Sequence, residues 1–353
     1  MSGGVDSSVA AYLIRSAGYE TAGVTMKLFD PEFSDPKGRI CCSEKDIHDA
    51  DDVSILIDIP YEVVDLRREF DERVIKPFIS VYESGGTPNP CIECNKFMKF
   101  SALRDYADSR GLYYIATGHY ARVEFDGARG RWILRKALDS KKDQSYVLYN
   151  LTQSDLQRVL FPLGNMTKDE VRSIAEREGY INARKRDSQD NCFVPDGDYA
   201  AFMERRRGEK YPQGDYISPD GRVLGSHLGS VHYTVGQRRG LDLPMGERCY
   251  VIEKDAARNT VTVSTDESLL FHRVCKLTDC NLISVSEIPP EGMSVSAKTR
   301  YSQREAPATV YPDGDGLRLE FSEPQRAMTV GQSAVFYDGD IVVGGGIIKE
   351  VGA

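Results

Sequence analysis

The chain has 353 residues, of which 41% are hydrophobic and 28% charged, and its formal net charge is −9 at pH 7. This composition is typical of a soluble globular protein with room for two or three domains. No apolar run approaches the length of a membrane span and no secretory signal is visible, so we expect a cytoplasmic protein with no membrane partner.

The chain begins with a loop rich in glycine and serine, which is followed by a predicted helix. Residues 2–8 read SGGVDSS, and apolar residues follow at helical spacing. Gly3 and Gly4 let a ligand approach the main chain closely, while Ser7 and Ser8 suit the entry of a helix. Because the free N–H groups at a helix start attract anions, the pattern predicts a phosphate-binding loop. The lysine of a Walker loop is absent.

Strand-like and helix-like segments alternate through the first half of the chain. The strand-like segments cover 21–29, 54–66 and 112–122, and the helix-like ones cover 95–111 and 167–180. This alternation predicts an α/β fold with a doubly wound parallel sheet, in which ligands sit at the carboxyl ends of the strands. A phosphate loop of this kind normally follows a buried strand. Only Met1 precedes it here, so we expect the first strand to be missing from this chain.

The pattern changes after about residue 210, where short β-rich runs are separated by turns of Gly, Pro and Asp. Such a pattern is typical of small antiparallel barrels or sandwiches. The change divides the chain into an α/β part and a β-rich part near residue 210.

The acidic net charge alone argues against a nucleic-acid partner, but charge acts locally. Basic residues gather in four short clusters, which are Arg184, Lys185 and Arg186; Arg205, Arg206, Arg207 and Lys210; Arg238 and Arg239; and Lys298, Arg300 and Arg304. Each cluster could be an ordinary solvated surface. Together they also fit an acidic enzyme that has one basic docking face.

Three cysteines stand in settings that favour a reactive thiolate. Cys91 and Cys94 form a Cys-x-x-Cys pair at the start of a helix, where the helix and Lys96 should lower the pKa of the thiol. Cys192 follows the basic cluster at 184–186. Half of a zinc site and an inert pair are the alternatives. A second tightly spaced Cys/His pair is missing, and the adjacent Cys41 and Cys42 are poor zinc ligands.

Eight ordered blocks resemble the tRNA-specific 2-thiouridylases, the MnmA/TrmU enzymes, nearly end to end. The blocks are SGGVDSSVAAYLI, TPNPCIECNKFMKF, IATGHYAR, DSKKDQSYVLY, DSQDNCFV, YTVGQRRGL, KTRY and GQSAVFYDG with GGGII. The first block also resembles the PP-loop of the ATP pyrophosphatases, which split ATP between the α- and β-phosphates. The resemblance implies three domains: a PP-loop ATP-binding catalytic domain over 1–200, a small central β-rich domain over 201–272, and a C-terminal β-barrel over 273–353.

The resemblance also implies roles for individual residues. Cys94 matches the nucleophile, and Cys192 matches the cysteine that receives sulfur as a persulfide. ATP, with Mg²⁺, would be bound at Ser2, Gly3, Gly4, Val5, Asp6, Ser7, Ser8, Met26 and Gly118. Contacts with tRNA, including the target base, would fall at Asn89, Pro90, Cys91, His119, Lys142, Asp143, Gln144, Arg300, Tyr301 and Gln332.

The implied activity is 2-thiolation of the wobble uridine, position 34, in tRNAs for Lys, Glu and Gln. ATP would adenylate the C2 oxygen and release pyrophosphate, and sulfur from Cys192 would then displace AMP. A Cys94–Cys192 disulfide would remain to be reduced. The base must leave the anticodon loop to reach the site. We expect a monomer that receives its sulfur from a donor protein which the sequence does not identify.

Two chemistries remain open because many relatives carry Asp where this chain has Cys91. One is the persulfide–disulfide cycle of Cys94 and Cys192. The other is a [4Fe–4S] cluster held by Cys91, Cys94 and Cys192, whose open iron would carry sulfide. His119 could act as a general base, contact RNA or simply pack near the loop.

Three other kinds of protein are alternatives to a thiolating enzyme: an amide-forming synthetase, a lysidine-type tRNA ligase, and a non-catalytic RNA-binding or metal-storage protein. An amide-forming synthetase or a lysidine-type tRNA ligase would use the same PP-loop chemistry, but neither needs paired thiols. A non-catalytic RNA-binding or metal-storage protein would not need the SGGVDSS loop. The three cysteines and the loop together therefore favour sulfur transfer to tRNA.

Overall fold

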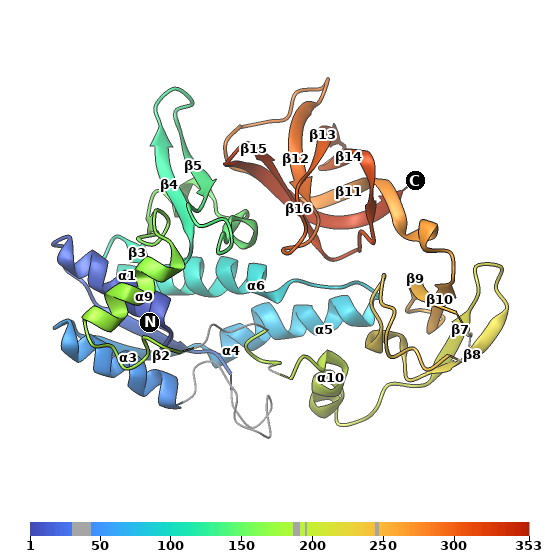
Figure 1. Cartoon of the computed structure of the whole chain (residues 1–353), viewed down its shortest axis with the longest axis horizontal. Coiled ribbons are helices and arrows are strands. Elements are labelled where there is room, and N and C mark those ends of the chain that lie inside the picture. The colour runs from blue at the N-terminus through green and yellow to red at the C-terminus, as the bar shows by residue number, and fades with distance from the viewer. Residues whose placement is uncertain (30–43, 186–190, 195, 244–246, 353) are drawn as a thin grey trace.

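The computed structural model describes residues 1–29, 44–185, 191–194, 196–243 and 247–352. Figure 1 shows an α/β part at one end, a small sheet at the other, and a β-barrel above the long helices that join them. The helices, with their 3-10 and π segments, are α1 (Val5–Ser16), α3 (Glu44–Leu56), α4 (Arg67–Phe70), η1 (Asp71–Ile75), α5 (Lys76–Glu83), α6 (Pro90–Glu93), η2 (Cys94–Ala102), α7 (Leu103–Ser109), η3 (Ser145–Leu148), α8 (Gln153–Leu156), α9 (Lys168–Arg177), α10 (Tyr199–Arg207), η4 (Ser230–His232) and η5 (Glu267–Leu270).

The strands form parallel pairs in the α/β part and mainly antiparallel sheets elsewhere. They are β1 (Gly23–Lys27), β2 (Tyr61–Asp65), β3 (Ile115–Ala116), β4 (Ala121–Asp126), β5 (Arg131–Lys136), β6 (Val159–Leu160), β7 (Gly214–Ile217), β8 (Val223–His227), β9 (Tyr250–Asp255), β10 (Thr260–Ser264), β11 (Phe271–Leu282), β12 (Met293–Lys298), β13 (Ala306–Asp313), β14 (Gly316–Arg326), β15 (Ser333–Asp338) and β16 (Ile341–Gly352).

The α/β part contains parallel strands within the predicted segments, but the segment 54–66 was wrong in its first half: residues 54–56 end the helix α3, and the strand is β2, Tyr61–Asp65. β1 pairs with β2, with Gly23 opposite Tyr61, and β3 pairs with β6, with Ile115 opposite Val159. Among the described residues these are two separate pairs. Met1 lies beside β1, because its carbonyl accepts a hydrogen bond from the Thr25 hydroxyl at 2.5 Å. The loop that follows Met1 therefore starts at the side of β1.

Two predicted helices are confirmed, and each carries the expected terminal signals. α9 begins with a capping box in which the Thr167 hydroxyl accepts from the Glu170 amide and the Glu170 carboxylate accepts from the Thr167 amide. The helix predicted over 95–111 is longer than expected, since α6, η2 and α7 follow one another without a break from Pro90. Its middle section is a π-helix that begins at Cys94, and π segments often mark functional sites.

The C-terminal part is a closed barrel, as the turn-rich β pattern predicted. Its strands run in the order β11-β14-β13-β12-β15-β16, and β16 pairs back with β11. All of these pairings are antiparallel. The central part is a four-stranded sheet in the order β8-β7-β10-β9.

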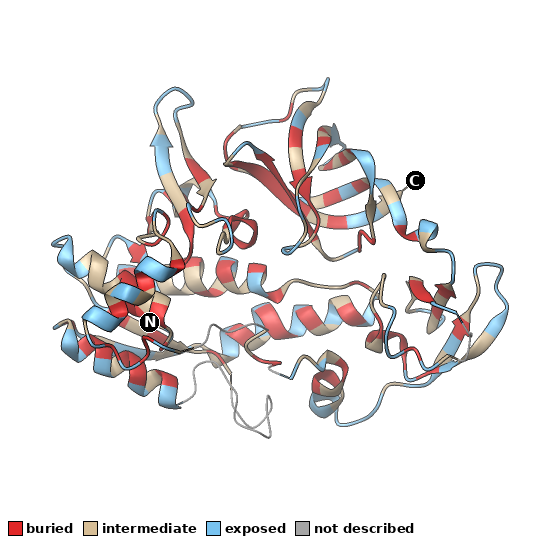
Figure 2. Cartoon of the chain, in the orientation of Figure 1, coloured by how far each residue is buried: buried red, intermediate tan, exposed pale blue. Residues whose placement is uncertain are grey.

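The barrel and the α/β part share one hydrophobic core. Ile92 and Phe100 of the long helix pack in the same cluster as Tyr146 of η3 and Val335 and Val342 of the barrel. The hairpin β4–β5 also joins the barrel sheet, through Arg135 opposite Ile341. Figure 2 shows buried residues running along the barrel strands and the helices beneath them. The barrel is thus fixed against the helix that carries Cys91 and Cys94. None of the helices in the described ranges has the length and apolar composition needed to cross a membrane.

Candidate active site

The predicted phosphate loop is a tight turn into α1. The Ser7 and Ser8 hydroxyls donate to the carbonyl of Gly4 at 3.0 and 3.2 Å, and the Ser2 amide donates to the Ser7 hydroxyl at 3.0 Å. Gly4 caps the helix, and no side chain in the described part of the chain caps it. The amides of the first turn therefore keep the potential to bind an anion. Val5, by contrast, is buried in the core below the loop.

Two glycines allow the chain to pass close to this loop. Gly3 has φ +69°, and a Cβ placed there would lie 2.3 Å from the carbonyl oxygen of Asp46. Gly118 meets the loop from the other side, since its Cβ would lie 2.7 Å from the carbonyl carbon of Asp6 and 2.8 Å from the nitrogen of Ser7. The structure thus places Gly118 against the loop, and its contact with the nucleotide stays a prediction. Any side chain at either position would displace the phosphate loop.

The carboxylate of Asp6 is held by two neighbours that the sequence did not reveal. The Lys168 ammonium donates to its two oxygens at 2.7 and 2.8 Å, and the Tyr120 hydroxyl donates at 2.7 Å. A carboxylate occupied in this way does not fit the expected Mg²⁺ ligand. Magnesium is commonly bound through substrate phosphates and water with few carboxylates, so the phosphates of ATP would supply its ligands.

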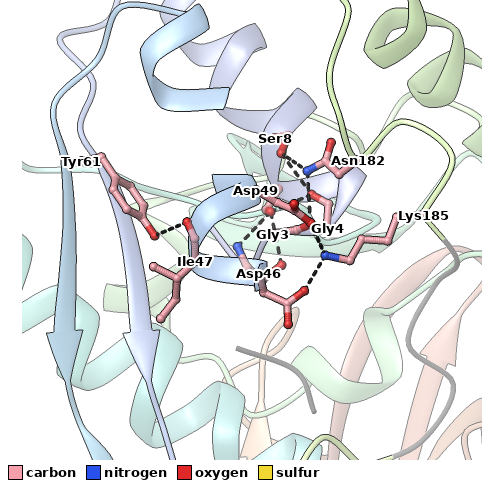
Figure 3. Close-up of polar contacts among 11 residues, drawn as sticks. Gly3, Gly4, Ser8, Asp46, Ile47, Asp49, Tyr61, Asn182 and Lys185 are labelled. Carbon is pink, nitrogen blue, oxygen red and sulfur yellow. Dashed lines mark hydrogen bonds and ion pairs between the residues drawn. The ribbon is translucent and has the colours of Figure 1, made fainter. Parts of the chain in front are cut away.

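The side chains of Asn182 and Lys185 bind the backbone of the loop at Gly3 (Figure 3). The carbonyl of Gly3 accepts from the Asn182 amide at 3.2 Å and from the Lys185 ammonium at 3.0 Å. Lys185 also donates to Asp49 at 2.7 Å and to Asp46. The sequence placed Lys185 only in a basic cluster and gave no signal for Asn182. Arg186 lies outside the described residues.

Cys94 contradicts the expectation of an acidic thiol. Burial raises the pKa of Cys94 to about 11, Lys99 opposes this shift, and Cys91 adds to it. The prediction failed because Cys94 lies within a long helix rather than at its first residue, and because its environment is dry. The predicted cation was also wrong. Lys96 lies over the ring of Phe97 at 5.2 Å, whereas Lys99, five residues along the π-helix, faces Cys94.

The other two thiols lie toward the same region. Cys91 is exposed, and its thiol donates to the Asn191 carboxamide oxygen at 3.6 Å, next to Cys192 in the chain. Cys94 and Cys192 pack against one hydrophobic cluster, which also receives Met26 from the end of β1. Cys94 and Cys192 therefore belong to one cluster with the end of β1, and Cys91 approaches it through Asn191.

The side chains present do not fit the alternative cluster. Within the described ranges, no group of three His, Cys, Asp or Glu residues is placed to hold a metal ion. This includes Cys91, Cys94 and Cys192, all of which are described. Cys41 and Cys42 lie outside the described residues. Cys275 is buried in the barrel core and Cys249 in the central sheet, as packing residues would be.

Known protein families and relatives match this chain over nearly its full length. Family models match residues 1–196 as a tRNA methyl transferase HUP domain, 200–265 as a tRNA methyl transferase PRC-barrel domain and 273–348 as an aminomethyltransferase beta-barrel domain. The tRNA-specific 2-thiouridylase MnmA of Moorella thermoacetica is 49% identical, covering 99% of this chain and 98% of that protein. MnmA 1 of Caldanaerobacter subterraneus subsp. tengcongensis is 47% identical, covering 99% and 96%.

The chain belongs to the tRNA-specific 2-thiouridylase family. The family-model names mention methyl transfer, whereas the full-length relatives are named for thiolation. Membership of this family supports the use of ATP, and the loop at residues 2–8 stays the predicted site for it.

The expected tRNA positions of this 2-thiouridylase lie in three places. Asn89, Pro90 and Cys91 start the long helix, with Cys91 exposed and Pro90 buried. The barrel holds this start in place, because the Gln332 amide donates to the carbonyls of Thr87 and Pro88 at 2.9 and 3.4 Å. Gln332 therefore acts on the segment beside Cys91, whatever else it contacts.

The second group surrounds η3. The Asp143 carboxylate accepts from the amides of Ala137 and Ser145, and the Gln144 carboxamide accepts from the Tyr120 amide. These two side chains shape the turn that carries Lys142. Tyr301 is 46% exposed, and its hydroxyl donates to the Asp143 carbonyl at 3.0 Å. Burial raises the pKa of Tyr301, and the charges of Asp143 and Cys91 add to the shift, so this ring lies near both.

Arg300 and His119 face the interior instead. The Arg300 guanidinium donates to the carbonyl of Ala327 at 2.6 Å and to the Thr329 hydroxyl at 3.2 Å. His119 is buried, with Nδ1 2.8 Å from the Thr117 hydroxyl and Nε2 3.2 Å from the Lys99 ammonium. Burial lowers the pKa of His119 well below its usual value, and Lys99 lowers it further. The imidazole is therefore neutral and holds Lys99 near Cys94.

The basic cluster on α10 is largely neutralised by neighbouring acids. Arg206 pairs with Asp71, and Arg207 lies 2.9 Å from Glu209. Arg205 is 4.0 Å from Asp196. These surface ion pairs leave little net positive charge on the helix. This cluster is therefore better interpreted as an ordinary solvated surface than as a docking face.

Proposed function

We propose that this chain is a tRNA-uridine 2-sulfurtransferase that thiolates C2 of the wobble uridine, position 34, of tRNA with the use of ATP. One observation carries the proposal: Cys94 and Cys192 pack on one cluster that Met26 joins from the strand beside the phosphate loop. The exposed Cys91 lies near both Cys94 and Tyr301, where an unstacked base could enter.

The first step is adenylation of the base. The C2 oxygen of uridine attacks the α-phosphate of ATP, the bond between the α- and β-phosphates breaks, and pyrophosphate leaves. The amides at the start of α1 would stabilise the phosphate charge. Mg²⁺, when bound with ATP, would neutralise part of that charge. The adenylate turns a poor leaving oxygen into AMP.

Sulfur transfer follows in the second step. A donor protein loads a sulfane sulfur onto Cys192 as a persulfide. The outer sulfur of the persulfide attacks C2, and the C2–O bond breaks as AMP leaves. The Cys94 thiolate attacks Sγ of Cys192, which releases the transferred sulfur and leaves a Cys94–Cys192 disulfide. A thiol reductant then supplies two electrons and two protons to restore both cysteines.

Lys99 and His119 prepare Cys94 for this attack. At neutral pH the buried Cys94 is a thiol, because its pKa is about 11. The nearby Lys99 ammonium favours the thiolate, and the neutral His119 accepts a hydrogen bond from Lys99 and holds it in place. We infer that His119 acts through Lys99 rather than as a general base or as an RNA contact.

The alternative sulfur route uses a [4Fe–4S] cluster on Cys91, Cys94 and Cys192. Against it stands the absence, among the described residues, of any three-residue group placed for a metal. We therefore favour the persulfide cycle. We also propose domain limits of 1–200, 201–272 and 273–353, which the three family-model ranges support.

The test is single-turnover thiolation of tRNA transcripts for Lys, Glu and Gln by anaerobically purified protein, with iron and sulfide content measured alongside. The persulfide cycle predicts thiolation by the wild type and by Cys91→Ala, and none by Cys94→Ala or Cys192→Ala. About four irons per chain with an inactive Cys91→Ala variant would establish the cluster route instead. No AMP and no thiolated base from the wild type would refute the function itself.

A further inference from the structure

Cys91 and Cys94 lie on one face of the first turn of the long helix. Side chains three positions apart on a helix are neighbours, and α6 continues into η2 between them without a break. This turn is also tighter than an ordinary α-helical turn. The Cys94 amide donates to the carbonyl of Cys91 as well as to that of Pro90. The bond to Cys91 is of the 3-10 type, in which the side chains at its two ends eclipse each other.

The geometry of this pair suits a disulfide. Helix geometry places Cα atoms three positions apart at about 5 Å, within the range of about 4.4–6.8 Å that disulfides span. The two thiols are also electrostatic neighbours. Burial is the main cause of the raised pKa of Cys94, and Cys91 adds to the rise. Cys-x-x-Cys pairs of this kind form disulfides in thiol oxidoreductases.

The three thiols differ in their access to solvent. Cys91 is exposed, whereas Cys94 and Cys192 are partly buried and pack against one hydrophobic cluster. A disulfide between Cys94 and Cys192 would therefore lie against an apolar surface. Thiol–disulfide exchange requires access to a sulfur atom. A protein reductant that approaches from solvent therefore reaches Cys91 more easily than either cysteine of that disulfide.

Cys91 also faces the chain segment that carries Cys192. Its thiol donates to the carboxamide oxygen of Asn191 at 3.6 Å, and Asn191 directly precedes Cys192. Cys91 therefore lies next to both segments that a Cys94–Cys192 disulfide would join: its own helix, which carries Cys94, and the segment at Asn191.

We propose that Cys91 is the resolving cysteine of the proposed sulfur cycle, and the inference rests on that proposed function. After sulfur has been transferred, the Cys91 thiolate attacks Sγ of Cys94 in the Cys94–Cys192 disulfide. The bond between Cys94 and Cys192 breaks, a Cys91–Cys94 disulfide forms, and Cys192 leaves as a thiolate. Cys192 takes up a proton to replace the one that Cys91 lost. The exchange needs no external electrons, because one disulfide replaces another.

The exposed sulfur of Cys91 then gives a reductant access to the disulfide. A dithiol reductant attacks Sγ of Cys91, and Cys94 leaves as a thiolate beside the Lys99 ammonium, which favours that charge. The second thiol of the reductant closes its own disulfide and releases Cys91. The reductant supplies two electrons and two protons in total. Cys192 is meanwhile a thiol again and can accept the next sulfane sulfur before the reductant arrives.

The position of the disulfide after one round of thiolation tests this assignment. Wild-type protein loaded with sulfane sulfur from inorganic polysulfide reacts with ATP and tRNA without reductant, and is then quenched in acid and alkylated. A sample without ATP is the blank. No Lys or Arg separates Cys91 from Cys94, so trypsin leaves both on one peptide and Cys192 on another. We expect an internal disulfide in the first peptide and an alkylated Cys192.

A variant gives the second measurement. Cys91→Ser keeps a hydrogen-bond donor toward Asn191 but has no sulfur, so it should stop at the Cys94–Cys192 disulfide. With thioredoxin as the reductant, the ratio of its steady-state rate to its own first-turnover rate should be at least about tenfold below that of the wild type. This ratio separates resolution of the disulfide from any effect of residue 91 on tRNA.

Two further comparisons make the variant specific. A high concentration of dithiothreitol, which is small enough to reach a partly buried disulfide, should restore the ratio in Cys91→Ser. Cys280→Ser is the matched control, because Cys280 is a partly buried thiol that packs against the barrel core. Its ratio should equal that of the wild type.

The outcomes separate this role from the proposed function. A wild type that thiolates tRNA yet keeps a Cys94–Cys192 disulfide, with Cys91 alkylated, would overturn the resolving role. An unchanged ratio in Cys91→Ser would overturn it as well. The disulfide mapping needs only the wild type, so the test remains valid if Cys91→Ser does not fold. A wild type that forms no thiolated base, or that thiolates tRNA without forming a disulfide, would refute the proposed persulfide cycle instead.

Discussion

The side-chain amide of Gln332 donates a hydrogen bond to the carbonyl of Thr87 at 2.9 Å, across the junction between the barrel and the helical part. The Thr87 amide also donates to the carbonyl of Val330 at 2.9 Å. Gly331 permits the close approach, since it has φ +88° and its Cβ would lie 3.1 Å from the nitrogen of Thr87. The barrel thus fixes the residues that lead into Cys91.

Replacing Gln332 with glutamate should slow thiolation while leaving ATP binding intact. The carboxylate cannot donate, and it would face the carbonyls of Thr87 and Pro88. A loss of about 1–2 kcal/mol of positioning corresponds to a fall of about tenfold in rate. Single-turnover thiolation and the KM for ATP measure the two effects. Gln325→Glu is the control, because its amide donates to Glu323 within the barrel strand β14. Equal rates for both variants would contradict this role.

Gly118→Ala should abolish nucleotide binding without unfolding the protein. The added methyl group would lie 2.7 Å from the backbone of Asp6, so the phosphate loop must move. Overpacking of this kind costs about 1–3 kcal/mol, and here the strain falls on the ATP site. The measurements are the dissociation constant for ATP and the midpoint of thermal unfolding. Gly127→Ala is the matched control, since no atom lies within 4 Å of its Cβ. Unchanged ATP affinity in Gly118→Ala would show that the loop tolerates the shift.

Local patterns predicted the features that depend on a few neighbouring residues. The glycines of the phosphate loop, the capping box at Thr167 and the closed barrel all follow from such patterns. Lys168, Asn182 and Lys185 were missed as site residues because their partners are distant in the chain: Asp6 lies far from Lys168, and Gly3 lies far from the other two.

The error at Cys94 has a similar origin. A Cys-x-x-Cys pair near a helix start suggests a low thiol pKa, but burial depends on the residues that the fold packs around the sulfur. Lys96 is close to Cys94 in the sequence, but residues two positions apart on a helix do not face each other. In the π-helix that begins at Cys94, the residue five positions along faces the thiol. Hydrophobic spacing and helix-end residues do not distinguish a π-helix from an α-helix.

The pH dependence of Cys94 modification should report its buried environment. With a pKa of about 11, the thiolate fraction rises about tenfold for each pH unit between 7 and 10, and so should the alkylation rate. Lys99→Met removes the cation that favours the thiolate and should lower the rate at pH 8 about threefold to tenfold. Lys96→Met is the control, because Lys96 lies over Phe97. A rate that levels off near pH 7, or equal effects of the two variants, would contradict this assignment.

The free energy of unfolding should increase as the pH rises from about 8 toward 10.5, because the folded protein loses the buried charge of Lys254. Its ammonium lies 3.3 Å from the Gly86 carbonyl, and burial lowers its pKa from the usual 10.5 to about 8. Between these values the unfolded chain binds a proton that the folded chain does not, so the free energy of unfolding increases with pH. Below pH 8 the folded protein also binds the proton and must bury the charge. The free energy of unfolding is therefore lower there and no longer changes with pH on account of Lys254.

Lys254→Met should therefore be more stable than the wild type at pH 7, by about 3 kcal/mol, and the difference should vanish near pH 10.5. Urea unfolding across pH 7 to 10.5 measures it. The thiols of Cys94 and Cys280, with raised pKa values of about 11, destabilise both proteins equally at high pH and cancel in the comparison. Lys276→Met is the control, since Lys276 is a surface residue 3.1 Å from Glu350. Parallel stability curves for the wild type and Lys254→Met would mean that Lys254 keeps an ordinary pKa in the folded protein.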